Sequence, residues 1–200
     1  MARPRKFVEE DVVLAAASAF VAKGYGGTTI EDLTKATGLG KQSLYNSFGG
    51  KRELFLRALA ASTTHIVDRA RESLAVSTKT PLDRVRGQLF ALALLFSSSG
   101  PIDSLFTKAT VELGDRDDEV AAAAGEALRR LETEYRDCLA EARDSGHIAA
   151  DCDLESLATY FVAVTRGMEV LGHAGASLET LQSVAANAME AIPLSDVTRR

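Results

Sequence analysis

Apolar residues recur at helical spacing along almost the whole chain. In residues 9–23 they stand at Val13, Ala16, Ala17 and Phe20, which is the i, i+3, i+4, i+7 pattern of one buried helix face. The sequence has no sustained alternation of apolar and polar residues and no Asn-Gly or Asp-Gly hairpin turn, which are the usual signs of strands. The pattern therefore predicts an all-α protein.

Glycine, proline and Thr or Asp caps divide this pattern into about nine helices. The predicted helices cover residues 9–23, 30–36, 40–46, 51–75, 81–96, 103–113, 117–143, 154–171 and 178–192. The last two are the most regular amphipathic pair and predict an antiparallel helical hairpin. Two such hairpins from two chains would form a four-helix interface, so we expect a homodimer through 154–172 and 177–192.

Composition narrows the class of protein. Of the 200 residues, 46% are apolar and 26% charged, as in an ordinary folded protein. The longest apolar run, 89–96, is too short to span a membrane, and the acidic residues at 9–11 interrupt any secretion signal. Cys138 and Cys152 lie outside any CxxC motif and fit reduced thiols. We therefore expect a cytoplasmic protein with no membrane partner.

The net charge of −5 is distributed unevenly. Residues 1–60 hold nine Lys or Arg against six Asp or Glu, a net of +3, whereas residues 61–200 carry a net of −8. A basic segment on an acidic remainder is compatible with a local binding site for a polyanion. The charge alone does not decide between a nucleic acid and another partner.

Residues 28–51 carry the most informative pattern. Two short helices joined by a turn with glycines at 38 and 40, and preceded by a longer helix, follow the plan of a helix-turn-helix. A small apolar core is expected from Leu33, Leu39, Leu44 and Phe48. The residues left exposed on the second helix would be Lys41, Gln42, Ser43, Tyr45 and Asn46, whose donors and acceptors suit base edges and phosphates. Short polar helices with a glycine turn also occur in helical proteins that bind no DNA.

The run from Thr28 to Phe55, TTIEDLTKATGLGKQSLYNSFGGKRELF, closely resembles the DNA-binding region of TetR family transcriptional regulators. The resemblance covers roughly residues 7–60 and includes Phe20 and the Lys23-Gly24-Tyr25 run before it. It implies a repressor that binds a palindromic DNA operator as a homodimer and is released by a small-molecule effector. It also implies phosphate contacts from Thr28 or Thr29, Tyr45 and Lys51, and base contacts from Lys41, Gln42, Ser43 and Asn46.

Two positions depart from the family pattern. Gly50 stands where many members have Ser or a similar cap, which would hold Lys51 less firmly because Gly caps less well by a few tenths of a kcal/mol. Asn46-Ser47 replaces the aromatic or His residues common there, which affects the expected operator sequence. A basic arm of Arg3, Arg5 and Lys6 could add a DNA contact or be a disordered tail.

The resemblance implies two domains: a helix-turn-helix domain at 1–50, and an effector-binding and dimerisation domain at 51–200 that begins with a connecting helix at 51–75. An effector pocket between helices needs apolar and aromatic side chains with a few polar ones. Candidates that could equally fill the core are His65, Phe90, Leu94, Phe106, Tyr135, Cys138, Phe161 and Met168.

Other kinds of site are poorly supported by the sequence. The three His residues have no partner at metal-ligand spacing, and no catalytic motif such as GxSxG or a P-loop occurs. We expect no enzyme activity, no metal site and no cofactor. Cys138 lies on an apolar stripe and is interpreted as a core residue first and a thiol sensor second. The remaining alternative is a helical dimer that binds a small molecule or a protein and has a degenerate DNA-binding segment.

Overall fold

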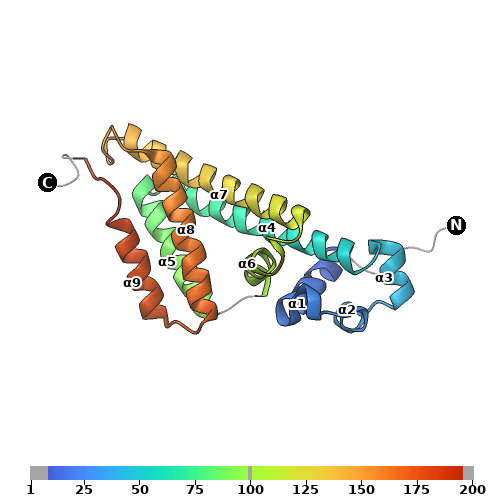
Figure 1. Cartoon of the computed structure of the whole chain (residues 1–200). Helices are drawn as coiled ribbons and strands as arrows, with labels where there is room; N and C mark the ends of the chain where they lie inside the picture. The colour runs from blue at the N-terminus through green and yellow to red at the C-terminus, as the bar shows by residue number, and fades with distance from the viewer. Residues whose placement is uncertain (1–8, 99–100, 196–200) are drawn as a thin grey trace. The chain divides into compact units, whose positions relative to one another are not determined.

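A computed structural model describes residues 9–98 and 101–195 (Figure 1). Over these residues the chain forms nine helices and no strand, only one isolated bridge between Ile148 and Leu194, and the all-α prediction is confirmed. The helices are α1 (Glu9–Gly27), α2 (Ile30–Thr37), α3 (Lys41–Phe48), α4 (Lys51–Leu74), α5 (Pro81–Ser98), α6 (Pro101–Leu113), α7 (Asp118–Asp144), α8 (Leu154–His173) and α9 (Leu178–Met189).

Most helix boundaries fall within two residues of the predicted ones, and two differ for identifiable reasons. The predicted end of α1 is residue 23, and its helical geometry does break at Gly24, although one further turn continues to Gly27. α9 ends at Met189 rather than at Ile192. Pro193 follows Ile192, and a residue before proline is disfavoured in helical geometry. Ile192 is nevertheless buried, so its apolar side chain indicates burial in the core and not a continuation of the helix.

The chain forms two compact units that are discontinuous in sequence. We call residues 1–65 and 101–125 the head and residues 66–100 and 126–200 the body. The head contains α1, α2, α3, the first part of α4, α6 and the start of α7, and its core brings Phe20 and Leu44 together with Leu105 of α6. Nothing in the local sequence pattern predicts that α6 packs against α1.

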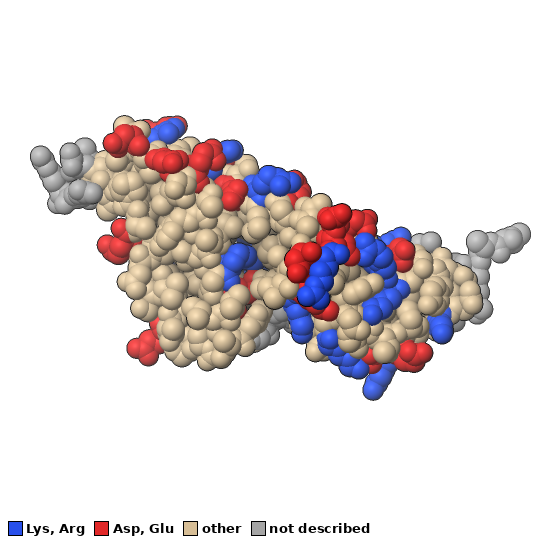
Figure 2. Space-filling view, viewed as in Figure 1, with Lys and Arg blue, Asp and Glu red and all other residues tan. Residues whose placement is uncertain are grey.

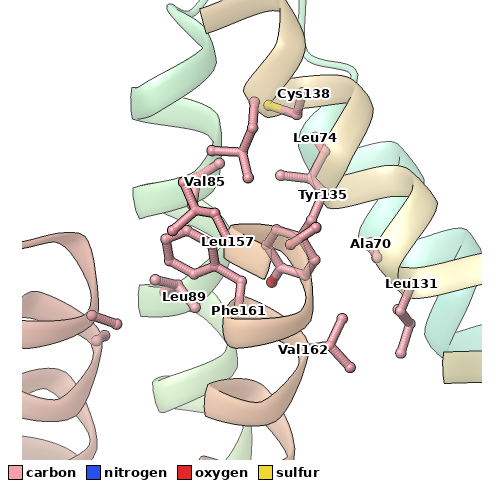
Figure 3. Packing of buried hydrophobic residues seen from close by; sticks show 14 of the residues in the cluster. Ala70, Leu74, Val85, Leu89, Leu131, Tyr135, Cys138, Leu157, Phe161 and Val162 are labelled. Atoms are coloured by element: carbon pink, nitrogen blue, oxygen red, sulfur yellow. The ribbon is translucent and has the colours of Figure 1, made fainter. Parts of the chain in front are cut away.

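The body is a helical bundle with its own apolar core. α8 and α9 form an antiparallel hairpin, as predicted, and both pack against α5 (Figure 1). The rings of Tyr135 on α7 and Phe161 on α8 stack with centroids 5.6 Å apart (Figure 3). Asp153 and Ser177 accept hydrogen bonds from the first-turn amides of α8 and α9, which fixes where each helix begins.

Candidate nucleic-acid interface

The two short helices of the head have the arrangement that the helix-turn-helix prediction requires. α2 ends at Thr37 and α3 begins at Lys41, so residues 38–40 separate the two helices. Leu33, Leu44 and Phe48 are almost completely buried, at 0, 0 and 2% exposure, in the core of the head. Burial of Leu44 and Phe48 fixes which face of α3 points inward and leaves the opposite face in solvent.

That opposite face of α3 carries every residue predicted to read bases. Lys41, Gln42, Ser43 and Asn46 are exposed, and Tyr45 is 43% exposed. The Gln42 amide donates to the Asn46 side-chain oxygen across one helical turn, Nε2 to Oδ1, at 3.0 Å. This bond leaves Gln42 one amide hydrogen and its oxygen, which is the donor and acceptor pair that matches an adenine edge.

The two threonines before α2 have different surroundings. Thr28 is 1% exposed, and its hydroxyl donates to the Gly24 carbonyl at 2.6 Å, so it faces the interior. Thr29 is exposed and caps α2: its hydroxyl accepts from the Asp32 amide at 3.1 Å, and its own amide donates to the Asp32 carboxylate at 3.0 Å. Of the two, only Thr29 lies on the surface where a phosphate could approach.

Asp32 also binds Lys23, with Nζ and Oδ1 2.5 Å apart. The hydrogen bond from Lys23, together with those from Thr29, lowers the pKa of the Asp32 carboxyl from 3.8 to about 2. Asp32 is therefore ionised at neutral pH, at the positive end of the α2 dipole.

Lys51 begins α4 and is held by an aromatic ring. Its ammonium lies over the Tyr25 ring, 4.4 Å from the centroid, in a cation–π contact. The Tyr25 ring is itself packed against Phe55 and Phe20, with centroids 4.7 and 6.3 Å away. Lys51 thus has a defined position despite the weak cap expected from Gly50.

Gly50 has a structural reason to be glycine. Its φ is +135°, in the region that other residues rarely adopt, and a Cβ at this position would lie 3.3 Å from Cε1 of Tyr45. The absence of a side chain lets the Tyr45 ring lie against the backbone between α3 and α4. Tyr45 and Lys51, two of the predicted phosphate contacts, therefore both depend on the conformation of this turn.

Sequence reasoning missed the roles of Tyr25 and Arg52. Tyr25 enters the sequence prediction only as part of the family pattern, and its contact with Lys51 depends on how α1 packs against α4. Arg52 stands beside Lys51 in a basic pair, but its guanidinium pairs with Asp117 at 2.5 Å and with Glu119 at the start of α7. Arg52 is thus engaged within the head, which leaves Lys51 as the candidate of the pair for a phosphate contact.

The predicted effector residues are divided between the two units. Tyr135, Cys138, Phe161 and Met168 are buried in one cluster in the body. Phe90 packs against that cluster, Leu94 is 60% exposed on α5, and His65 and Phe106 belong to the head.

Tyr135 is the notable member of the buried cluster. It is 1% exposed, and its hydroxyl has no hydrogen-bond partner among the described residues. Burial raises the pKa of this phenol well above its ordinary value, so the hydroxyl is a neutral donor. Figure 3 shows its oxygen beside the Phe161 side chain of α8.

Cys138 has the surroundings of a core residue. Its Sγ donates to the Pro81 carbonyl at 3.4 Å, and burial raises the pKa of the thiol to about 11. A protonated, buried thiol reacts slowly with oxidants, which favours the core interpretation over the sensor one.

Other kinds of site find no support in the described part of the chain. No group of three or more His, Cys, Asp or Glu that could hold a metal lies within residues 9–98 and 101–195. None of the helices described has both the length and the apolar character needed to cross a membrane. The basic arm of Arg3, Arg5 and Lys6 lies outside the described residues.

The basic residues of the head are concentrated in its first sixty positions. On the face drawn in Figure 2, Lys and Arg side chains gather over the head, whereas Asp and Glu are the commoner charged residues over the body. Residues 1–60 carry a net charge of +3, but residues 101–125, which also belong to the head, hold two Lys or Arg against six Asp or Glu. The whole head therefore has a net charge of −1 and the body one of −4.

Comparisons with known proteins agree with this geometry. Residues 12–58 match the model for bacterial regulatory proteins of the tetR family, and residues 81–191 match the model for the tetracyclin repressor-like C-terminal domain. Together the two models cover the helix-turn-helix and most of the body.

Curated relatives and solved structures are similar over nearly the full length. The transcriptional repressor ComR of Escherichia coli is 24% identical, with 96% of this chain and 91% of that protein aligned. The repressor AcnR of Corynebacterium efficiens is 29% identical, with 88 and 87% aligned. A cysteine-substituted CifR, a TetR family regulator bound to 26-bp operator DNA, is 29% identical with a TM-score of 0.79 over 96% of this chain and 100% of that one. A TetR regulator from Chloroflexus aurantiacus has a TM-score of 0.83 at 23% identity, over 93 and 95% of the two chains. These are regulators and not enzymes, and the chain belongs to the TetR family of DNA-binding transcriptional regulators.

Proposed function

We propose that the protein is a ligand-responsive repressor that binds a palindromic operator as a homodimer in the cytoplasm and is released by a small-molecule effector. The observation that carries the proposal is the outward face of α3, where Lys41, Gln42, Ser43 and Asn46 are exposed above a buried apolar core. Such a face can enter the major groove, and a two-fold dimer requires a near-palindromic site.

Each candidate residue has a role in this proposal. Lys41, Gln42, Ser43 and Asn46 would contact base edges. Thr29 at the start of α2, Tyr45 on α3 and Lys51 at the start of α4 would contact phosphates. Thr28 would act from the interior, because its hydroxyl is bound to the Gly24 carbonyl.

We further propose that the effector binds in the body, beside Tyr135 and Phe161. The Tyr135 hydroxyl is buried without a partner among the described residues, which costs free energy, and a ligand that accepts its hydrogen bond would recover this cost. The α8–α9 hairpin would form the dimer interface, with apolar side chains exposed on α8 at Tyr160, Val170 and Leu171.

The effector would act by favouring a DNA-incompetent conformation. A coupling of about 1–3 kcal/mol between the two sites lowers operator affinity roughly 5- to 150-fold.

Selection of duplexes from a random DNA pool by the purified protein, followed by sequencing, tests the proposal. The expected result is a palindrome whose half-sites lie about one helical turn apart or somewhat more. Affinity for the selected duplex should fall steeply with salt, because each phosphate that the protein neutralises releases condensed counterions. Failure to enrich any sequence at low salt would contradict DNA binding and favour a partner that binds the body.

Alanine variants at Lys41 and Gln42 test the assigned roles. If either residue reads a base, its replacement should cost about 1–3 kcal/mol at one position of the half-site. An equal loss on scrambled DNA would show that the residue contacts only phosphate.

A further inference from the structure

The C-terminal end of α1 is bound by a carboxylate from α6. The Glu112 side chain accepts hydrogen bonds from the backbone amides of Tyr25 and Gly26, at 2.9 and 2.8 Å. Glu112 is 87 and 86 positions away from these residues in the sequence, and all three belong to the same compact unit. Hydrogen bonds to an ionised carboxylate are roughly twice as strong as neutral ones, so these two bonds define the position of the turn.

The backbone of the turn is shaped around this carboxylate. Gly24 has φ +72° and ψ 171°, and a Cβ there would lie 2.6 Å from Oε2 of Glu112. Only glycine combines this conformation with so close an approach. One turn earlier on α6, Lys108 donates from Nζ to the Val21 carbonyl at 2.5 Å, which satisfies a carbonyl near the end of the first helical segment.

The same turn supports two of the proposed phosphate contacts. Its Tyr25 ring lies under the Lys51 ammonium, and its Gly24 carbonyl accepts the hydroxyl hydrogen of Thr28, the residue before the α2 cap Thr29. The position of the turn therefore determines where α2 begins and where the Lys51 ammonium lies.

We infer that Tyr25 and Glu112 are positioning residues for DNA binding. Glu112 fixes the turn through two backbone amides, the turn fixes the Tyr25 ring, and the ring holds the Lys51 ammonium in place for a phosphate. The inference rests on the proposed function, since it presumes that Lys51 binds DNA. Glu112 lies on α6, outside the helix-turn-helix sequence, so the residues that support DNA binding extend beyond that motif.

The physical reason is the flexibility of lysine. A free Lys side chain loses much rotamer entropy when it is fixed against a phosphate. An ammonium already held over a ring has lost part of that freedom before DNA arrives. A cation–π contact at an exposed site is worth about 0.5–1 kcal/mol, which corresponds to about a two- to fivefold change in affinity for each protomer.

Double-variant cycles in the full-length protein test the inference. Binding of a fluorescent duplex obtained by selection from the random pool would be measured at several salt concentrations, for Tyr25→Leu, Tyr25→Phe, Glu112→Gln and Lys51→Met. Lys51→Met should reduce the slope of log affinity against log salt by about 0.9 for each phosphate that is no longer neutralised. Tyr25→Leu should weaken DNA binding about fivefold or more. Tyr25→Phe, which keeps the aromatic ring, should bind DNA as tightly as the unmodified protein.

The sign of the Glu112 effect is distinctive. Removal of a negative charge from a DNA-binding protein should by itself strengthen binding. The inference expects the opposite for Glu112→Gln, because the amide that it introduces has one acceptor oxygen in place of two, and each backbone amide is bound by a different oxygen. Glu126→Gln, which removes an exposed carboxylate on α7, is the matched control and should not weaken binding.

Combining each substitution with Lys51→Met separates a positioning role from a purely structural one. If Tyr25 acts through Lys51, Tyr25→Leu should have little further effect in the Lys51→Met protein. Glu112→Gln should there lose the part of its effect that acts through the Tyr25 ring. Additive losses there, with helical content unchanged by circular dichroism, would overturn the inference and leave the proposed function standing. An unchanged salt slope in Lys51→Met would overturn both the inference and the role of Lys51, whereas failure of the unmodified protein to bind any duplex would overturn the proposed function itself.

Discussion

Glu112 in the head and Glu169 in the body are both bound glutamates, but their surroundings differ. Glu112 is half-buried and accepts two backbone hydrogen bonds, which tie α6 to the end of α1. Glu169 is 0% exposed on α8 and pairs with Arg166, one turn earlier on the same helix, at 2.7 Å. The carboxylate of Glu112 joins two helices, whereas the ion pair of Glu169 joins neighbouring residues within one helix.

The two glutamates also differ in how deeply their polar contacts lie. In the head, polar contacts lie near the surface and fix the backbone that presents the proposed DNA contacts. In the body, Glu169 is completely buried, and the Tyr135 hydroxyl lies among apolar side chains (Figure 3). Burial of a charge, and of a hydroxyl that has no partner among the described residues, costs stability.

Substitution of Glu169 should produce the largest loss of stability. Glu169→Gln removes the negative charge beside the largely buried Arg166 guanidinium and should lower the free energy of unfolding by about 3 kcal/mol. Glu112→Gln should cost less than about 1 kcal/mol, because water can reach the backbone amide that it leaves unbound. Urea titrations of both variants measure the difference.

The double variant Arg166→Met/Glu169→Leu serves as the control, since it removes both charges and nearly keeps the volume. Its stability should return to within about 1 kcal/mol of the unmodified protein. Equal losses for Glu112→Gln and Glu169→Gln would contradict the distinction between the two units.

Removal of the Tyr135 hydroxyl should change the free energy of unfolding by a smaller amount and in the opposite direction. Tyr135→Phe removes a donor that has no partner within residues 9–98 and 101–195 and leaves the ring stacked on Phe161 unchanged. It should raise the free energy of unfolding by about 1 kcal/mol. The matched change Tyr25→Phe in the head should leave stability nearly unchanged, since that residue is partly exposed. Thermal unfolding measures both variants, and a lower melting temperature for Tyr135→Phe would refute the assignment of an unsatisfied hydroxyl.

The sequence predicted the fold well because the signals are local. Helical periodicity, helix-ending glycines and caps such as Thr29 act over a few positions and identified the nine helices of the described residues. The α3 face was predictable for the same reason, since Leu44 and Phe48 define its buried side.

Long-range contacts were not predictable in this way. Glu112 lies in an ordinary amphipathic segment, and its binding to Tyr25 and Gly26 arises only when α6 packs on α1. The sequence alone marks Gly50 as a poor cap, because the positive φ and the nearby Tyr45 ring that require glycine are properties of the folded turn.

The effector candidates show the same limit of local patterns. Both His65, which is exposed, and Phe106, which is buried, lie on helices like the candidates of the body, yet both belong to the head. Periodicity shows which face of a helix is buried, but it does not show which helices supply the neighbouring side chains.

The smallest expected effect concerns Asp32, an acidic residue of the head that lies nearer the surface than Glu169. Its hydrogen bonds with Lys23 and Thr29 lower the carboxyl pKa from 3.8 to about 2. A carboxyl whose pKa is depressed by folding stabilises the protein above its unfolded pKa, and this contribution is lost as the pH falls from about 4 through about 2. The difference in stability between the unmodified protein and Asp32→Asn should therefore be constant from pH 7 to about 5 and shrink below pH 4.

Urea titrations across this pH range measure the Asp32 effect, with added salt as the control. Salt should reduce the difference at pH 7, since the Lys23 side chain is about half exposed and its attraction to Asp32 is screened. A difference that stayed constant down to about pH 2 would show that Asp32 stabilises the start of α2 through the shape of its side chain and not through its charge.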